Sequence, residues 1–177
     1  ADGVAFCDFR HGIFSRMSIN LLKEAIPPNI FCVADSQVAS RWGNITEFKG
    51  FDLITPNERE SRFALADQDS TIGGLAGLLH ERAENKNLIL KLGERGVFCS
   101  AKDKTADNPY FSVSSFASTI KDAVGSGDAL LAYATLSMLT TGSLVKAAIL
   151  GSMAAACECE LDGNIPIQLE MVLAKID

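Results

Sequence analysis

The 177-residue chain is poor in histidine, in positive charge and in long apolar runs. No segment reaches the roughly 18–20 consecutive apolar residues needed to span a bilayer, and no basic stretch leading into an apolar run marks a signal peptide. Acidic residues outnumber basic ones by 22 to 16, which gives a formal net charge of −6. A general nucleic-acid or anionic-membrane binder needs surplus Lys and Arg. We therefore expect neither nucleic acid nor membrane as a partner, and a cytoplasmic location.

Cysteine is present, but not in a pattern that indicates disulfides or a zinc site. The five cysteines are odd in number, and none of their spacings resembles a disulfide framework. Cys157 and Cys159 form the one close pair, but a zinc site needs further ligands, and the sequence holds only two histidines and no second pair of cysteines. We therefore expect buried thiols in a reducing compartment.

The composition is that of a folded globular protein. Hydrophobic residues make up 47% and charged residues 21%, which excludes intrinsic disorder as the main state. The length corresponds to one ordinary domain of roughly 150 residues with a full core. The sequence has no initiator Met and starts at Ala1 directly before an apolar run, so we interpret it as beginning inside a longer chain.

Short apolar runs alternate with segments of helical spacing. This alternation predicts βαβ units, a mostly parallel sheet and helices on both of its faces, which is a three-layer α/β sandwich. The expected strands are residues 4–7, 30–34, 51–54, 87–92, 97–99 and 110–113, and the expected helices are residues 17–25, 58–63, 71–83, 128–139, 143–157 and 168–175.

Several expected strands are followed directly by a polar residue or a glycine. Asp8, Asp35, Asn57 and Gly93 each come just after a predicted strand. Ligands of parallel α/β sheets bind at the carboxyl ends of the strands. We therefore expect these residues to gather along one edge of the sheet.

The strongest local signal is Gly125-Ser126-Gly127-Asp128, at the junction between a loop and a predicted helix. Successive small residues expose backbone N–H groups, and a helix N-terminus adds unpaired donors and the positive end of the helix dipole. These donors suit a phosphate or a developing anion, and the carboxylate of Asp128 beside them could accept a proton from a hydroxyl. An aspartate in the first turn could equally act as a simple helix cap.

This loop differs from two common nucleotide-binding motifs. The string Gly-x4-Gly-Lys-Ser/Thr of P-loop enzymes occurs nowhere in the chain. The dinucleotide motif Gly-x-Gly-x-x-Gly fails because its last position is Leu130. P-loop NTPases and dinucleotide enzymes are therefore disfavoured.

A second constellation is Asn57 and Glu60, three residues apart after a predicted strand. An amide and a carboxylate on one face of the first helical turn could hold Mg²⁺ through water, next to a phosphate. The same spacing is that of a capping box, in which Asn57 caps the helix and Glu60 is its third residue. Spacing alone leaves both readings open.

A third constellation runs from Lys91 to Gly96, where Gly93 and Gly96 lie between two predicted strands. Two glycines three residues apart predict a tight turn. A plain β-hairpin explains them as well as a nucleotide site does.

Together these motifs resemble the PfkB, or ribokinase-like, family of carbohydrate kinases. The order Asn-x-x-Glu, strand-x-Gly-x-x-Gly, Asp-x-x-Gly-x-Gly-Asp matches, and residues 122–128 look like the family's C-terminal signature with Ser126 in place of its usual Ala. Residues 7–12 look like its Asp-Phe/Tyr-Gly-x-Gly segment, and residues 51–60 like its Thr-Pro-Asn-x-x-Glu segment. Residues 163–167 are similar to the heptose-kinase domain of ADP-heptose synthases.

The resemblance implies ATP-dependent phosphorylation of a sugar hydroxyl, with a nucleotide and a small sugar as partners. Asp128 would be the catalytic base, and the amides of Gly125, Ser126 and Gly127 would stabilise the transferring phosphoryl group. Asn57 and Glu60 would organise Mg²⁺. The residues that would border the ATP are Asn57, Lys91, Gly93, Gly96 and Asn164.

Two departures separate the chain from heptose-kinase-like members. Asp35-Ser36-Gln37 stands where those members carry Asp-Pro-Lys, so a lysine that could meet phosphate is missing. Lys91 stands where many family members have Thr.

The resemblance covers nearly all of residues 1–177 but only the C-terminal, nucleotide-binding and catalytic part of a PfkB-type kinase domain. The missing half supplies most sugar contacts, so the sugar stays open. A half-family chain would leave a sheet edge and apolar surface uncovered, which favours self-association, for instance as a homodimer. The alternatives are a non-catalytic nucleotide-binding module of a larger fusion protein, and a kinase for a nucleoside or vitamin alcohol.

Overall fold

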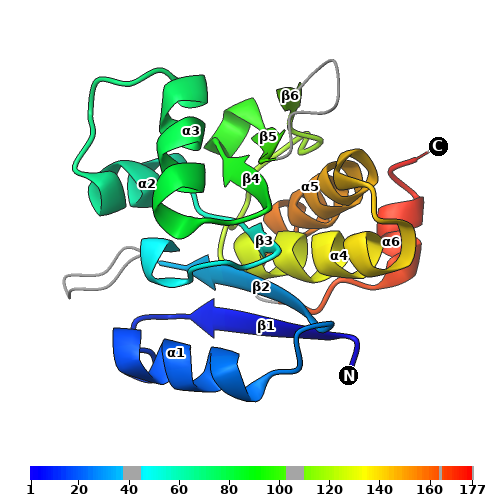
Figure 1. Cartoon of the computed structure of the whole chain (residues 1–177). Helices are drawn as coiled ribbons and strands as arrows, with labels where there is room; N and C mark the ends of the chain where they lie inside the picture. Colours follow the sequence, from blue (N-terminus) through cyan, green and yellow to red (C-terminus); the bar gives the residue numbers. More distant parts are fainter. Residues whose placement is uncertain (38–44, 103–109, 164, 177) are drawn as a thin grey trace. The chain divides into compact units, whose positions relative to one another are not determined.

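The computed structural model describes residues 1–37, 45–102, 110–163 and 165–176, and strands alternate with helices through much of the chain (Figure 1). The strands are β1 (Gly3–Asp8), β2 (Phe31–Ser36), β3 (Leu53–Ile54), β4 (Asn87–Lys91), β5 (Val97–Ala101) and β6 (Tyr110–Val113). The helices are α1 (Arg16–Ala25), α2 (Glu58–Leu65), α3 (Ile72–Ala83), α4 (Ser126–Thr141), α5 (Leu144–Glu160) and α6 (Leu169–Leu173), with two short 3₁₀ turns, η1 (Ile45–Glu47) and η2 (Gly93–Arg95).

The six strands form one sheet in the order β1-β2-β3-β4-β5-β6. The pairs β1–β2, β2–β3 and β3–β4 are all parallel. Asp8 lies beside Ser36, and Ile54 lies beside Leu88. The carboxyl ends of β1 to β4 therefore lie along one edge. The mostly parallel α/β architecture predicted from the sequence is confirmed.

The chain divides into two compact units: Ala1–Lys91 with Ser100–Phe111, and Leu92–Cys99 with Ser112–Asp177. In the first unit, phenylalanine rings form part of the core. Phe51 contacts Phe6 and Phe48 edge-on, with ring centroids 5.0 and 5.5 Å apart. Lys23 of α1 holds its ammonium 4.8 Å from the centre of the Phe51 ring, which joins α1 to this cluster.

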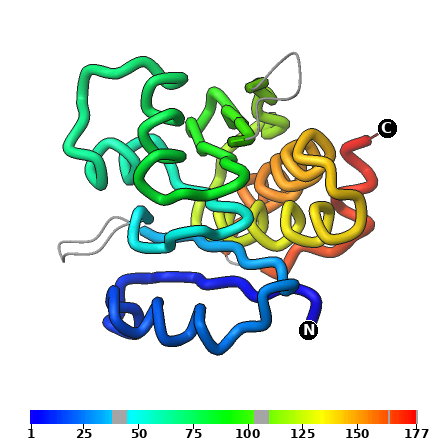
Figure 2. Tube along the Cα trace, viewed as in Figure 1, coloured from blue at the N-terminus to red at the C-terminus, as the bar shows by residue number. Residues whose placement is uncertain are grey.

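In the second unit, α4 and α5 lie against each other (Figure 2). Their close approach depends on Gly151 of α5, because a Cβ there would lie only 3.0 Å from the carbonyl oxygen of Leu130. The side chains of Met153, Cys157 and Val172 are buried together and connect α5 to α6. Helix α4, which begins at the Gly-rich loop, is thus held in place by its packing against α5.

Most element boundaries differ from the sequence-based expectation by one to three residues. β3 begins at Leu53, two residues later than expected, and the Asp52 N–H just before it bonds the Cys32 carbonyl. α4 begins at Ser126, two residues earlier than expected, because Gly125 adopts the left-handed conformation and ends the preceding loop. α6 is shorter than the expected 168–175, since the last residues form only turns.

Two surface features bear on partners. No helix in the described part of the chain has the length and apolar character needed to cross a bilayer. β1 is a terminal strand of the sheet, and Ile13, Met17 and Leu21 nearby in sequence are exposed. Self-association through such surfaces stays a prediction.

Candidate active site

The carboxyl ends of β1 and β2 each carry a buried aspartate, as expected. The carboxylate of Asp8 accepts the backbone N–H of Arg10 at 2.8 Å and also pairs with the Arg10 guanidinium. Asp35 accepts two hydrogen bonds from the ammonium of Lys91, at 3.0 and 2.9 Å. The side chains of Asp35 and Lys91 are only 11% and 18% exposed, so this ion pair is largely shielded from water.

Lys91 reaches Asp35 across the end of a neighbouring strand. β3 lies between β2, which ends near Asp35, and β4, which ends at Lys91. Thr55 directly follows β3 and is fully buried, and its hydroxyl has no hydrogen-bond partner among the described residues. The ion pair therefore lies at the same sheet edge as a buried, unsatisfied polar group, which is typical of functional edges.

Asn57 and Glu60 form a complete capping box at the start of α2. The Glu60 carboxylate accepts the Asn57 backbone N–H at 2.7 Å and its side-chain amide at 2.6 Å, and the Asn57 side-chain oxygen accepts the Glu60 N–H at 2.8 Å. Asn57 also forms a parallel bridge with Lys91. Asn57, Glu60 and Lys91 are thus brought together in the first unit.

The capping box does not exclude Mg²⁺. Each carboxylate oxygen has a second lone pair, and Mg²⁺ commonly keeps its waters and takes only one or two carboxylates beside substrate phosphates. In the described ranges there is no group of three or more His, Cys, Asp or Glu side chains that could hold a metal alone. The residues therefore fit a water-mediated, phosphate-supported ion, with Glu60 as its carboxylate, and this role stays a prediction.

The Gly-rich loop of the second unit is folded tightly before α4. The Asp122 carboxylate accepts the Val124 N–H at 2.9 Å, and the Ser126 hydroxyl donates to the Ala123 carbonyl at 2.8 Å. Gly125 is the left-handed N-cap of α4, with φ of 87°, and offers no side chain to the helix end. The amide donors of the first turn are therefore left without a side-chain cap.

The first turn of α4 presents Asp128 beside these amides. The N–H groups of Gly127 and Asp128 belong to the first turn, where no intrahelical acceptor exists. The Ser126 N–H makes a longer bond of 3.3 Å to the Ala123 carbonyl, so it is the least available of the three expected donors. Asp128 itself is exposed. This arrangement can receive an anion next to a carboxylate.

Gly93 and Gly96 lie in the tight turn that was expected between β4 and β5. Both have positive φ, and the Leu92 N–H closes the turn on the Gly96 carbonyl at 2.8 Å. Gly96 is pressed against the backbone of Val113, whose oxygen would lie 2.1 Å from a Cβ at this position. Asn164, the remaining residue expected to border the nucleotide, lies outside the described residues.

The sequence analysis missed the contact between Asp35 and Lys91. The two residues are 56 positions apart, and no local pattern joins them. The sequence signal that could have revealed this contact was the two departures from the family pattern: Gln37 stands where a lysine is expected, and Lys91 stands where many members have Thr. None of the five cysteines forms a disulfide; Cys32, Cys99 and Cys157 are buried, and Cys7 and Cys159 are half-buried.

A model of one protein family matches most of the chain. The family model described as pfkB family carbohydrate kinase matches residues 29–169. Among curated protein sequences, none matches the chain significantly.

Solved structures of similar fold include two ribokinases and a phosphofructokinase. The ribokinase of Thermotoga maritima is 22% identical, with a TM-score of 0.79 over 99% of this chain and 57% of that one. A ribokinase of Arabidopsis thaliana, complexed with ribose and ATP, is 18% identical, with a TM-score of 0.79 over 99% of this chain and 56% of that one. Phosphofructokinase-2 of Escherichia coli in complex with potassium is 14% identical, with a TM-score of 0.81 over 97% of this chain and 55% of that one. The chain thus spans little more than half the length of these structures.

Proposed function

The chain belongs to the pfkB family of carbohydrate kinases, and on this premise we propose that it is the nucleotide-binding and catalytic part of an ATP-dependent sugar kinase. The acceptor is a hydroxyl of a sugar or sugar phosphate. The observation that carries the proposal is the start of α4, where the exposed Asp128 lies beside amide donors that no side chain caps.

Asp128 acts as the general base. Its carboxylate accepts the proton of the sugar hydroxyl as the hydroxyl oxygen forms a bond to the γ-phosphorus and the bond to the ADP oxygen breaks. The amides of Gly125, Ser126 and Gly127 form the anion hole for the charge on the transferring group. Gly127 contributes more than Ser126, because the Ser126 amide is partly engaged with the Ala123 carbonyl.

Lys91, Asn57 and Glu60 serve the ATP phosphates. Lys91 pairs with Asn57 through the backbone, and its ammonium, which donates two hydrogen bonds to Asp35, keeps a third N–H for a phosphate. Glu60 orients the Asn57 side-chain amide, because its carboxylate accepts from Nδ2 and its backbone N–H donates to Oδ1. When bound, Mg²⁺ would neutralise charge on the phosphates, and Glu60 is the residue that would hold it through water. Gly93, Gly96 and Asn164 border the nucleotide.

Substitution of Asp128 by Asn tests the proposal. In the intact protein that contains this sequence, Asp128→Asn should lower the rate of ATP-dependent sugar phosphorylation by about 10²–10⁴-fold, the usual contribution of a general base. Binding of MgATP, measured by calorimetry on the 177-residue chain, should stay within about twofold, because the base contacts the acceptor and not the nucleotide.

The outcome separates this function from its alternatives. A non-catalytic nucleotide-binding module binds ATP but shows no transfer to a panel of sugars, nucleosides and vitamin alcohols. A nucleoside or vitamin kinase shows transfer to one of those alcohols and not to a sugar. Absence of any ATP binding by the wild-type protein would falsify all three.

A further inference from the structure

A polar pocket of about 400 Å³ lies in the first unit, away from the residues discussed so far. Its lining side chains come from α1, from the η1 segment and from α3. Three of the six are cationic and one is acidic, in a chain whose net charge is −6. The lining residues are Arg16, Asn20, Thr46, Glu47, Lys49 and Arg82.

Two of the lining residues, Lys49 and Arg82, lie toward the amino ends of β3 and β4, whereas Arg16 begins the helix that follows the carboxyl end of β1. Lys49 precedes β3 and Arg82 precedes β4, and their neighbours are tied together by a hydrogen bond of 2.9 Å from the Gly50 N–H to the Ala83 carbonyl. Asn57 and Lys91, by contrast, lie at the carboxyl ends of these strands. None of the six lining residues belongs to the set proposed to bind ATP, so the two groups of residues are distinct.

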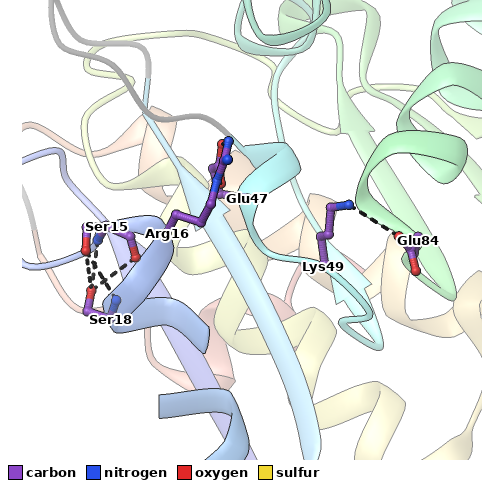
Figure 3. A network of polar contacts seen from close by, with 6 residues as sticks. All are labelled: Ser15, Arg16, Ser18, Glu47, Lys49 and Glu84. Atoms are coloured by element: carbon purple, nitrogen blue, oxygen red, sulfur yellow. Dashed lines mark hydrogen bonds and ion pairs between the residues drawn. The ribbon is translucent and has the colours of Figure 1, made fainter. Parts of the chain in front are cut away.

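Ion pairs hold two of the cations in place (Figure 3). The Arg16 guanidinium donates two hydrogen bonds to the Glu47 carboxylate, from Nε at 2.7 Å and from Nη2 at 2.9 Å. This hydrogen bond with Arg16 holds the pKa of Glu47 below its ordinary value, so the pair stays charged. Lys49 contacts Glu84 at a longer 3.4 Å. Each ion pair thus orients the charged group of Arg16 or Lys49 and leaves some of its N–H donors unused.

Donors remain for a ligand. Within the part of the chain that the structure describes, the guanidinium of Arg82 makes no hydrogen bond or ion pair. Nη1 of Arg16 is not used by Glu47, and the Lys49 ammonium has two further N–H groups. Even with Glu84 counted, the cations exceed the acids by three to two. Guanidinium groups bind the oxygens of phosphate in a bidentate manner, and a lysine adds a point charge.

We propose that this pocket binds a small phosphate-class dianion, either inorganic phosphate or a phosphomonoester, between Arg16, Lys49 and Arg82. The volume lies within the usual range for small-molecule sites, and the amide of Asn20 and the hydroxyl of Thr46 would orient the group carried by the phosphate. The proposal goes beyond the kinase function and does not depend on it.

The test is a titration of the chain with inorganic phosphate and, separately, with glycerol 3-phosphate, each against sodium chloride at matched ionic strength. Arginine Nε–H signals in NMR spectra report the site, and calorimetry gives the affinity. We expect saturable shifts of the Arg16 and Arg82 signals with at least one phosphate and none with chloride. The tighter of the two phosphates identifies the source of the ligand. No saturable shift with either one overturns the proposal.

Substitutions in the pocket test whether the phosphate binds there. Arg82→Ala and Lys49→Ala should each weaken phosphate binding by about tenfold, because each removes a charge-assisted contact. Arg59→Ala and Lys86→Ala remove exposed cations that do not line the pocket, and should change it by less than about twofold. Arg82→Gln serves as the second variant if Arg82→Ala does not fold.

Lys91→Met separates this site from the proposed ATP site. Phosphate binding should be unchanged in Lys91→Met. If binding is lost there and kept in Arg82→Ala, the phosphate is at the ATP edge and the pocket proposal is wrong. If ATP binding fails in every variant while phosphate still binds in the pocket, the kinase proposal fails and this one stands.

Discussion

The ammonium of Lys91 donates to both carboxylate oxygens of Asp35, although β3 separates the strands that carry them. The lysine expected after Asp35 from the heptose-kinase resemblance is Gln37 in this chain. Lys91 brings an ammonium to the same aspartate from β4. One of the two departures noted in the sequence, Lys91, therefore pairs with Asp35, which lies two residues before the other, Gln37.

The ion pair predicts a strong energetic coupling. Lys91→Met should lower the free energy of unfolding by about 2–4 kcal/mol, because it leaves a shielded carboxylate without its partner. The double variant Asp35→Asn, Lys91→Met should be less destabilised than the sum of the single variants. Chemical denaturation of the four proteins measures the coupling, and additive effects would contradict it.

The capping box and the proposed metal role can be separated by two substitutions. Asn57→Ala removes the cap of α2 and should cost about 1 kcal/mol of stability. Glu60→Gln keeps acceptor and donor atoms at the cap but loses the charge, so stability should change less while Mg²⁺-dependent ATP binding weakens. Denaturation and calorimetry with and without Mg²⁺ check the two effects. An unchanged Mg²⁺ dependence in Glu60→Gln assigns the residue to capping alone.

The two glycines of the η2 turn, Gly93 and Gly96, should differ sharply in how much stability is lost when each is replaced by alanine. Gly96→Ala would place a Cβ 2.1 Å from the Val113 oxygen, on a backbone with φ of 84°. Nothing lies within 4 Å of a Cβ at Gly93, where φ is 63°. Gly93→Ala should therefore cost about 1–2 kcal/mol for the left-handed backbone alone, and Gly96→Ala at least about 4 kcal/mol. Thermal unfolding ranks the two, and equal losses would show that Val113 moves aside.

His80 predicts a dependence of stability on pH. Its Nδ1 lies 3.1 Å from the Asn85 carbonyl and its Nε2 lies 2.8 Å from the Ser100 hydroxyl. A carbonyl can only accept, so Nδ1 carries the proton and Nε2 accepts from Ser100. Burial lowers the pKa of His80 below its ordinary 6.5. The stabilising contribution of neutral His80 is thus present above pH 6.5 and is lost as the pH falls from there toward the lowered value.

Denaturation between pH 7.5 and 5 measures this effect. His80→Gln should flatten the fall in stability in that interval, whatever its effect at neutral pH. His11→Gln, which changes the other histidine at an exposed position, serves as the matched control variant. A slope that survives in His80→Gln assigns the dependence to other groups.

Local chemistry made most of the fold predictable. The alternation of apolar runs located all six strands, and Asn57, Thr71 and Ser143 were readable as residues that start helices. The parallel direction of β1 to β4 followed from the same alternation. The start of α4 was misplaced by two residues, because a left-handed N-cap glycine leaves no polar side chain to mark the boundary.

The site was predictable only where its residues are close in sequence. Asn57 with Glu60, and Gly125 with Asp128, each lie within one turn of helix, so spacing reveals them. The contact of Lys91 with Asp35 depends on how far a four-carbon side chain reaches across β3, and the pocket around Arg82 depends on three separate elements. Such long-range placements are set by packing, which no local pattern encodes.

Gly151 controls the distance between α4 and α5, far in sequence from the residues proposed to meet a substrate. At this residue α5 lies against the Leu130 carbonyl of α4, so the size of the side chain at position 151 sets the spacing between the two helices. A methyl group at position 151 would push α4 outward by a few tenths of an ångström, and Asp128 moves with the first turn of that helix. Protein engineers could therefore retune the reach of the proposed base without changing any group that meets a substrate.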